Sequence, residues 1–162
     1  MEIIQIGPLK IEFLHSKHDT GGGLDMFRFF VPSAGRMPVP HYHRNWDETV
    51  YGLEGEVTFT VAGVAQTIGP GETLYITRGT VHGFDNRSGK NAVCLAVLTP
   101  GVLGPEYFRE LADLVAKGQP DPGMVKEIML RHGLVPVPIP AVEESGAEPP
   151  SVSRYIPGQS VQ

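Results

Sequence analysis

The chain has 162 residues, a length typical of one domain that can bury its own hydrophobic core. Its 13 basic and 18 acidic residues give a net charge of −5 at pH 7, and no basic run is present, so we expect no nucleic-acid partner. The single cysteine, Cys94, excludes an intrachain disulfide, and no apolar run is long enough to cross a bilayer. With no recognisable secretory leader, the sequence predicts a cytoplasmic protein without a membrane partner.

Short β-strands dominate the structure that we expect before residue 104. The chain contains 20 glycines and 15 prolines, which predict many turns and few long helices. Alternating apolar and polar residues, or short apolar runs, predict strands in residues 2–5, 9–15, 24–31, 56–61, 64–68, 72–76, 80–86 and 91–98. About eight to ten short strands at such close spacing are typical of an all-β antiparallel barrel or jelly roll.

Two of these strands have faces of different character. In residues 9–15, Lys10 and Glu12 alternate with apolar side chains, so we expect both on a solvent-exposed face. In residues 24–31, aromatic side chains fall on both faces, which predicts a strand covered on both sides, as in a sandwich or an oligomer interface. Arg28 lies in this strand, and we interpret it as a surface or bridging charge and not as an anchor for an anionic substrate.

The stretch from residue 35 to residue 55 carries the first group of potential metal ligands. His41 and His43 are separated by one residue, and in an extended strand such residues point to the same face. Glu48 follows them and can come beside them if the strand bends. Two imidazoles and a carboxylate form a facial set that suits a divalent transition metal and leaves positions open for water or substrate.

A third imidazole, His82, lies far downstream, after a turn at Gly79. It can join the first two histidines if the two strands face each other across a barrel. Phe84 shares the face of His82 by parity and could wall a pocket beside it. Gly52 shares the face of Glu48, where a residue without a side chain would widen the cavity.

Together these residues form two motifs that resemble those of the cupins. The first cupin motif orders glycine, H-x-H, glutamate and glycine at fixed spacing, which matches Gly35, His41, His43, Glu48 and Gly55. The second motif matches Gly71, Gly79, His82 and Asn86, with Thr77 where the family usually has proline. The chain is similar to the small single-domain cupins described as quercetin dioxygenase-like.

This resemblance implies a cupin-type double-stranded β-helix, also called a jelly-roll barrel, with a metal centre. The ligands that it implies are His41, His43, Glu48 and His82. They would bind one divalent transition metal per chain, with Fe, Mn, Ni, Cu, Co and Zn all compatible with the ligand types. Four protein ligands leave two positions open on a six-coordinate ion, and Glu48 could also take a proton from a substrate hydroxyl.

The hydrophobic period changes after residue 104. Residues 104–117 and 121–133 show helical spacing and predict two amphipathic helices, the second capped by Asp121 and ended by Gly133. We expect their apolar stripes to pack on the outer face of the barrel or on a partner subunit. The sequence therefore divides into a barrel domain of residues 1–100, a helical appendage of residues 101–140, and a polar, flexible tail of residues 141–162.

The remaining candidate side chains are interpreted as structural. Trp46 and Tyr51 are expected to pack, Asp47 to face solvent, and Cys94, within an apolar strand, to be inert. Three histidines have no partner at ligand spacing and are expected at the surface or as caps: His15, His18 and His132.

Two classes of function remain open for such a chain. The first is an enzyme, with a metal-dependent non-haem dioxygenase acting on a small enolic or aromatic molecule as the leading interpretation. Isomerases, decarboxylases and hydrolases of the cupin family use the same ligands and are alternatives. The second class is a cupin that binds a small ligand without turnover, because a widely used fold does not fix function. The aromatic strand and the added helices also predict a homodimer.

Overall fold

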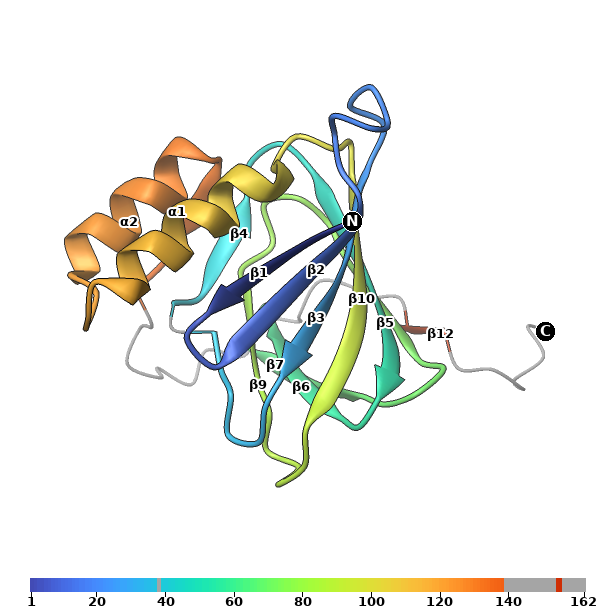
Figure 1. The fold of residues 1–162 in the computed structure, drawn as a ribbon. Helices are drawn as coiled ribbons and strands as arrows, with labels where there is room; N and C mark the ends of the chain where they lie inside the picture. Colours follow the sequence, from blue (N-terminus) through green and yellow to red (C-terminus); the bar gives the residue numbers. More distant parts are fainter. Residues whose placement is uncertain (38, 139–153, 156–162) are drawn as a thin grey trace.

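The computed structural model describes residues 1–37, 39–138 and 154–155, which form two antiparallel sheets and two helices (Figure 1). The seven-stranded sheet has the order β1 (Glu2–Ile6), β2 (Leu9–His15), β3 (Asp25–Val31), β10 (Ala92–Thr99), β5 (Asp47–Glu54), β8 (Thr73–Ile76) and β12 (Arg154–Tyr155). The five-stranded sheet has the order β11 (Leu134–Pro136), β4 (His41–His43), β9 (His82–Asp85), β6 (Val57–Val61) and β7 (Val64–Ile68). The predicted all-β jelly roll is confirmed.

The hydrophobic core lies between the inner faces of the two sheets. Phe27, Phe29 and Val31 are buried along β3, while the residues between them are partly exposed, as the two-residue period predicts. Val57 and Phe59 of β6 contribute to the same core from the other sheet. The predicted strand alternation is therefore what brings the two apolar faces together.

Glu12 departs from the prediction of a solvent-exposed face. It is only 6% exposed, although Lys10 on the same face is partly exposed. Strand pairing sets Glu12 opposite Arg28, whose Nη2 donates a hydrogen bond to the Glu12 carboxylate at 2.7 Å. Burial of a charge is tolerated when it is paired in this way. Arg28 is a bridging charge, in agreement with the interpretation from the sequence.

Both predicted helices are present, as α1 (Gly104–Ala116) and α2 (Pro122–Arg131). The carboxylate of Asp121 caps α2 by accepting a hydrogen bond from the backbone N–H of Met124 at 3.0 Å. Gly133 ends the second helical segment with a φ of 83°, a left-handed conformation that glycine adopts without steric cost.

The chain returns to the barrel directly after α2. Strand β11 pairs with β4, so that Leu134 lies opposite His43 and Pro136 opposite His41. The segment predicted as a separate appendage thus contributes a strand beside the two histidines. In the predicted flexible tail, Arg154–Tyr155 forms β12 on the edge of β8. Residues 141–153 and 156–162 lie outside the described part of the chain, and their flexibility stays a prediction.

Large apolar side chains that remain exposed include Ile3 on β1, Tyr51 on β5 and Tyr75 on β8. Such side chains can form subunit contacts, and the homodimer stays a prediction. Within the described ranges, no helix has the length and apolar character needed to span a membrane.

Helix α1 is attached to the barrel by a buried carboxylate. Asp25 of β3 is fully buried and accepts hydrogen bonds from the backbone N–H groups of Leu103 and Gly104, both at 3.1 Å. It also accepts one from the backbone N–H of Lys17 at 2.6 Å. Leu103 occupies the N-cap position and has no side-chain oxygen, so Asp25 supplies the missing acceptor from a distant strand.

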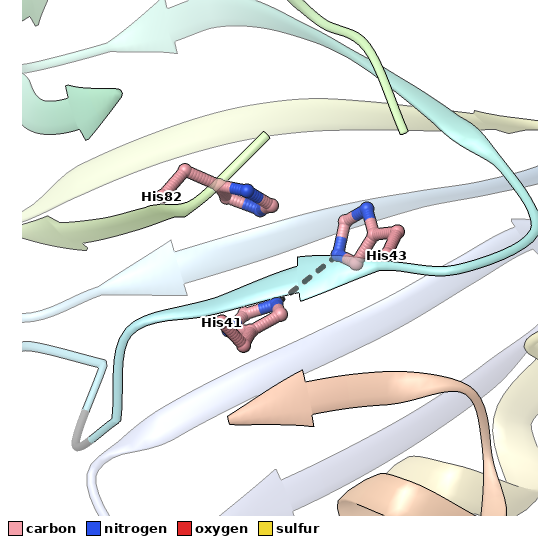
Figure 2. Close-up of side chains that lie close together, drawn as sticks. All are labelled: His41, His43 and His82. Atoms are coloured by element: carbon pink, nitrogen blue, oxygen red, sulfur yellow. Dashed lines mark hydrogen bonds between the residues drawn. The ribbon is translucent and has the colours of Figure 1, made fainter. Parts of the chain in front are cut away.

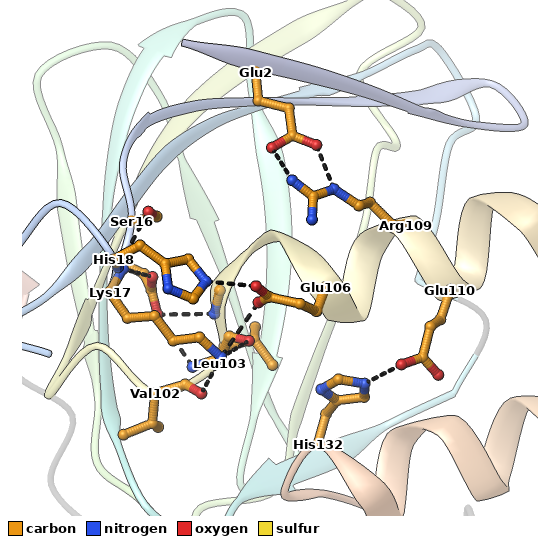
Figure 3. A network of polar contacts seen from close by, with 12 residues as sticks. Glu2, Ser16, Lys17, His18, Val102, Leu103, Glu106, Arg109, Glu110 and His132 are labelled. Carbon is orange, nitrogen blue, oxygen red and sulfur yellow. Dashed lines mark hydrogen bonds and ion pairs between the residues drawn. The ribbon is translucent and has the colours of Figure 1, made fainter.

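Ion pairs and hydrogen bonds on the outer side of the helices attach them to neighbouring segments (Figure 3). They link α1 to the strand side of the molecule and α1 to the end of α2. The pairs are Glu106–Lys17, Glu106–His18, Arg109–Glu2 and Glu110–His132. His18 and His132 thus have the structural roles expected from the sequence.

We expect Asp25→Ala to lower the free energy of unfolding by roughly 2–4 kcal/mol, because it leaves buried N–H groups without an acceptor. Urea unfolding measures the change, and hydrogen exchange should show faster opening of α1. Asp25→Asn keeps one acceptor oxygen and should cost less. The matched control is Asp113→Ala on the exposed face of α1. A loss for Asp25→Ala no larger than that of this control contradicts the anchoring role.

Candidate metal centre

His41 and His82 lie side by side because their strands are neighbours. Strand β4 pairs with β9, and His41 is directly opposite His82 in that register. The prediction that the two strands face each other across the barrel is therefore wrong: both histidines come from one sheet. The centroids of their rings are 4.7 Å apart, a normal spacing for directly opposed side chains.

The three imidazoles converge on one point (Figure 2). His43 is two residues from His41 on the same face of β4, and the Nε2 atoms of these two rings are 3.1 Å apart. One ring nitrogen from each of His41, His43 and His82 lies within 4.8 Å of the others. All three side chains are buried, with residue exposures of 2%, 5% and 4%. The H-x-H pair and the distant histidine thus form one cluster.

Glu48 approaches this cluster from the opposite sheet. It lies on β5, and the chain between His43 and Asp47 crosses from one sheet to the other instead of bending within one strand. The Glu48 Oε2 atom is 3.4 Å from His82 Nε2 and 3.8 Å from His43 Nε2. In the part of the chain that the structure describes, the cluster with mutual 4.8 Å spacing contains the histidines only. Ligation by Glu48 stays a prediction, supported by its position at the edge.

The spacing of the donor atoms fits one transition-metal ion. Donors bonded at about 2.0–2.2 Å lie roughly 3–3.5 Å apart when they are neighbours in tetrahedral or octahedral geometry. The distances of 3.1 Å between the His41 and His43 nitrogens and 3.4 Å from His82 to Glu48 fall in this range. Three imidazoles and a carboxylate suit the borderline divalent ions predicted from the sequence.

Backbone carbonyls fix the orientation of two of the rings. His41 Nδ1 lies 3.3 Å from the Val39 carbonyl oxygen, and His82 Nδ1 lies 2.9 Å from that of Thr80. When each Nδ1–H donates to its carbonyl, the Nε2 lone pair points toward the cluster. This is the arrangement that outer contacts impose on metal-binding histidines.

The turn before His82 is fastened to β4 and β5. The Gly79 N–H donates to the His43 carbonyl at 2.8 Å, and Arg78 forms a two-atom ion pair with Asp47. The Arg78 guanidinium lowers the pKa of Asp47 to about 2, and the Asp47 carboxylate also accepts a hydrogen bond from the Arg78 backbone N–H at 2.8 Å. Thr77, in place of the usual cupin proline, bonds through its hydroxyl to that of Thr80 at 2.9 Å.

Trp46 supports the cluster from the side of the helices. Its ring is fully buried and stacks on His43 with centroids 4.5 Å apart and an interplanar angle of 21°. Gly133 lies against this indole, where an added Cβ would be 3.2 Å from a ring carbon. Trp46 therefore packs as predicted, and it packs directly against a predicted metal ligand, His43. The sequence pattern did not reveal this contact.

Burial keeps the histidines in the state that binds metal. Desolvation lowers the pKa of His41 from 6.5 to about 3, and the neighbouring His82 lowers it further. The same two causes lower the pKa of His43 strongly. Both rings are thus neutral at physiological pH, and a neutral imidazole is the form that offers a lone pair to an ion.

A cavity of about 170 Å³ adjoins the cluster, and three of the predicted ligands line it: His41, His43 and Glu48. Phe84 also lines it, as predicted from parity. The two helices contribute six further lining residues: Tyr107, Phe108, Leu111, Val115, Val125 and Met129. Their apolar stripes therefore face the cavity and not the outside of the barrel, in contrast to the prediction.

Gly52 does not widen this cavity. Its backbone lies against the Gly69 carbonyl, where an added Cβ would be only 2.0 Å from the oxygen. The Gly52 N–H also donates to the Glu72 carbonyl at 3.0 Å. The glycine is needed for this close approach of two backbones, which is a structural reason unrelated to the pocket. Cys94 is buried, and burial raises its pKa to about 12, in line with the predicted inert role.

We expect protein purified without an affinity tag to contain close to one equivalent of a divalent transition metal. His41→Ala and His82→Ala should each reduce the metal content at equal protein concentration by more than tenfold, because each removes a ligand. Elemental mass spectrometry measures the content. His15→Ala, an exposed histidine outside the cluster, is the matched control. Equal loss in this control, or no binding by the native chain after reconstitution, contradicts the site.

The metal-free protein should lose stability as the pH falls, because His41 is neutral in the folded chain and protonated in the unfolded one. The pKa of His41 is near 3 in the folded chain, against an ordinary value of 6.5 in the unfolded chain. Protonation of the unfolded chain therefore costs little stability above pH 6.5, and the loss of stability grows as the pH falls from 6.5 toward 3. At pH 5.0 the loss from this one group is about 2 kcal/mol. Thermal unfolding at pH 7.5 and 5.0 tests it: His41→Gln should narrow the difference in Tm, whereas His15→Gln should not.

Comparisons with known proteins agree with this geometry. Residues 27–98 match the Cupin domain family. Quercetin 2,3-dioxygenase of Bacillus subtilis (strain 168) is 37% identical over 82 residues, which cover 51% of this chain and 23% of that enzyme. The chain therefore spans about a quarter of the length of this curated relative.

Solved structures show the same fold. The polyketide cyclase RemF from Streptomyces resistomycificus is 28% identical with a TM-score of 0.51, over 57% of this chain and 66% of that one. A predicted oxalate decarboxylase from Thermotoga maritima is 24% identical with a TM-score of 0.56, over 61% and 90% of the two chains. With its two sheets, its paired motifs and its histidine cluster, the chain has the jelly-roll fold of the cupins, and residues 27–98 are the part that matches the Cupin domain family.

Proposed function

We propose that this cupin is a metal-dependent, non-haem dioxygenase that acts on a small enolic or aromatic molecule. The observation that carries the proposal is the position of three buried imidazoles and one carboxylate beside an otherwise apolar cavity. The 37% identity with quercetin 2,3-dioxygenase, over half of this chain, supports oxygenase chemistry.

The ligand set leaves room for reactants. His41, His43, His82 and Glu48 would hold the metal, and four protein ligands on a six-coordinate ion leave two positions free. When bound, the metal supplies Lewis acidity and a binding site for an enolate or catecholate oxygen and for dioxygen. The four side chains would hold the ion beside the cavity, which His41, His43 and Glu48 line.

Glu48 is the side chain best placed to move a proton. Its side chain is 13% exposed and lines the cavity, so a bound hydroxyl can reach a carboxylate oxygen. Because it comes from the sheet opposite the histidines, it can accept a proton from the substrate without disturbing the paired His41 and His82. A carboxylate that both binds the ion and accepts this proton prepares an enolate or catecholate for oxidation.

The apolar walls exclude water from the reaction. Phe27, Phe29 and Phe84 line the cavity from the barrel, and Phe108 and Leu111 line it from α1. A dry cavity strengthens electrostatic interactions at the metal centre and limits hydrolysis of reactive species.

A second candidate is a reaction that uses the same centre without oxygen, such as cyclisation, isomerisation, decarboxylation or hydrolysis. The 28% identity with the polyketide cyclase RemF favours cyclisation in this group. Here Glu48 would act as a base toward a substrate polarised by the metal. Binding of a small ligand without turnover is the remaining alternative.

Oxygen consumption distinguishes these functions. Protein reconstituted separately with Fe, Mn, Co, Ni and Cu is supplied with enolic and catecholic compounds, and oxygen uptake and product formation are measured. We expect one O₂ to be consumed per product and turnover to stop under anaerobic conditions. Product formation that is equally fast without oxygen assigns the second candidate, and binding without product assigns the ligand-binding alternative.

The proton transfer proposed for Glu48 can be tested by substitution. Glu48→Gln should lower turnover per bound metal by more than a hundredfold, since the amide cannot accept the proton. Glu54→Gln, on the exposed end of the same strand, should leave turnover unchanged. Retention of at least half of the native turnover per metal in Glu48→Gln would remove Glu48 from the proton transfer.

A further inference from the structure

The helices contribute one wall of the cavity. Tyr107, Phe108, Leu111 and Val115 are spaced so that they lie on one face of α1, and all four line the cavity. Met129 of α2 lines it as well. The ligands of the predicted metal centre come from the barrel, whereas this second wall comes from residues after position 104. The helices therefore help to determine the shape of the molecule that can bind, together with the barrel residues that line the cavity.

The described residues that line the cavity include no positive side chain. Among the described residues that line it, the titratable ones are His41, His43, Glu48 and Tyr107, and none is lysine or arginine. Burial raises the pKa of Tyr107, so its phenol stays neutral. An anionic substrate would lose its hydration and would meet the Glu48 carboxylate, with the metal alone as counter-charge.

Nearby cations are engaged on the opposite side of the helices. Arg109 pairs with Glu2, and Lys17 pairs with Glu106 at 3.2 Å (Figure 3). Arg131 pairs with a carboxylate of α1 at 3.3 Å. These partners hold the positive charges outside the cavity. A phosphate or dicarboxylate bound at the metal centre would find no second cationic anchor among the described lining residues.

The size of the cavity limits the substrate to about one ring. Its volume is about 170 Å³. An engineered apolar cavity of roughly 150 Å³ in another protein takes up a single benzene molecule. A ring of this size would lie among aromatic walls, with Phe29 and Phe84 at 5.5 Å from each other and Phe27 and Phe108 at 5.1 Å, measured between centroids.

We propose that the α1–α2 pair is the specificity-determining wall of this cupin, and that it selects an uncharged, single-ring molecule with adjacent oxygens that chelate the metal. Charged chelators are excluded because the described lining residues include no lysine or arginine. Molecules with two or more rings are excluded by Leu111 and its neighbours. The chemistry of the chelating oxygens rests on the proposed function, whereas the size and charge selection rests on the cavity itself.

Four probe molecules test the selection by size, the selection by charge and the chelation of the metal independently. Isothermal titration calorimetry is carried out on metal-loaded protein with 4-methylcatechol, 2,3-dihydroxynaphthalene and oxalate, and on metal-free protein with toluene. We expect 4-methylcatechol to bind at least tenfold more tightly than the two-ring compound or oxalate. Toluene should bind to the metal-free chain, because its ring needs only the apolar walls.

Substitutions at one helix position test the wall. Leu111→Trp should fill the cavity and weaken 4-methylcatechol and toluene by more than tenfold, while the metal content stays unchanged. Leu111→Ala should enlarge the cavity and bring 2,3-dihydroxynaphthalene to at least the affinity of 4-methylcatechol. Leu130→Trp, the same change on the exposed side of α2 and outside the cavity, is the matched control.

The outcomes distinguish the two levels of the proposal. If toluene binds to the native chain and Leu111→Trp removes this binding, the role of the helices as a wall is supported. If metal-loaded protein does not bind 4-methylcatechol in the same series, the oxygen-chelating substrate is rejected. Oxalate binding as tight as that of 4-methylcatechol overturns the charge selection. Equal affinity of the native chain for one-ring and two-ring probes overturns the size selection. Equal effects of Leu111→Trp and Leu130→Trp on binding overturn the role of α1.

Discussion

The antiparallel pairing of β4 with β9 is the constraint on which the metal centre depends. It places His41 opposite His82, and the two-residue period of β4 then brings His43 to the same face. A slip of one residue in this register would turn the histidines of one strand to the other face of the sheet. Strand β11, on the other side of β4, holds the same register. The cluster is therefore a product of backbone hydrogen bonds before any ion is present.

The helices and the metal centre are connected by a short, continuous set of contacts. Strand β11 follows α2 and pairs with β4, while the Gly133 carbonyl accepts a hydrogen bond from the Arg44 N–H at 3.0 Å. Gly133 also touches Trp46, which stacks on His43. At the other end, Asp25 holds the start of α1 to β3. One structural unit thus carries both the ligands and the wall of the cavity.

Most of the fold and the composition of the site could be predicted from the sequence, because local patterns determine them. Alternation identified the strands, helical spacing identified α1 and α2, and motif spacing singled out the three histidines that the structure brings together. The arrangement of the elements could not be predicted. That β4 and β9 are neighbours depends on pairing between distant segments, and the burial of Glu12 depends on Arg28 in the next strand. An apolar helical stripe likewise does not reveal which surface it covers.

The stacking of Trp46 on His43 has a spectroscopic consequence. Trp46 is the only tryptophan of the chain, so its indole provides the tryptophan fluorescence of the whole protein. Because it lies 4.5 Å from a ring of the cluster, an open-shell ion bound there would quench this emission by energy or electron transfer. Zinc, with its filled d shell, has no such pathway. Trp46 fluorescence would thus distinguish bound open-shell ions from zinc without any added label.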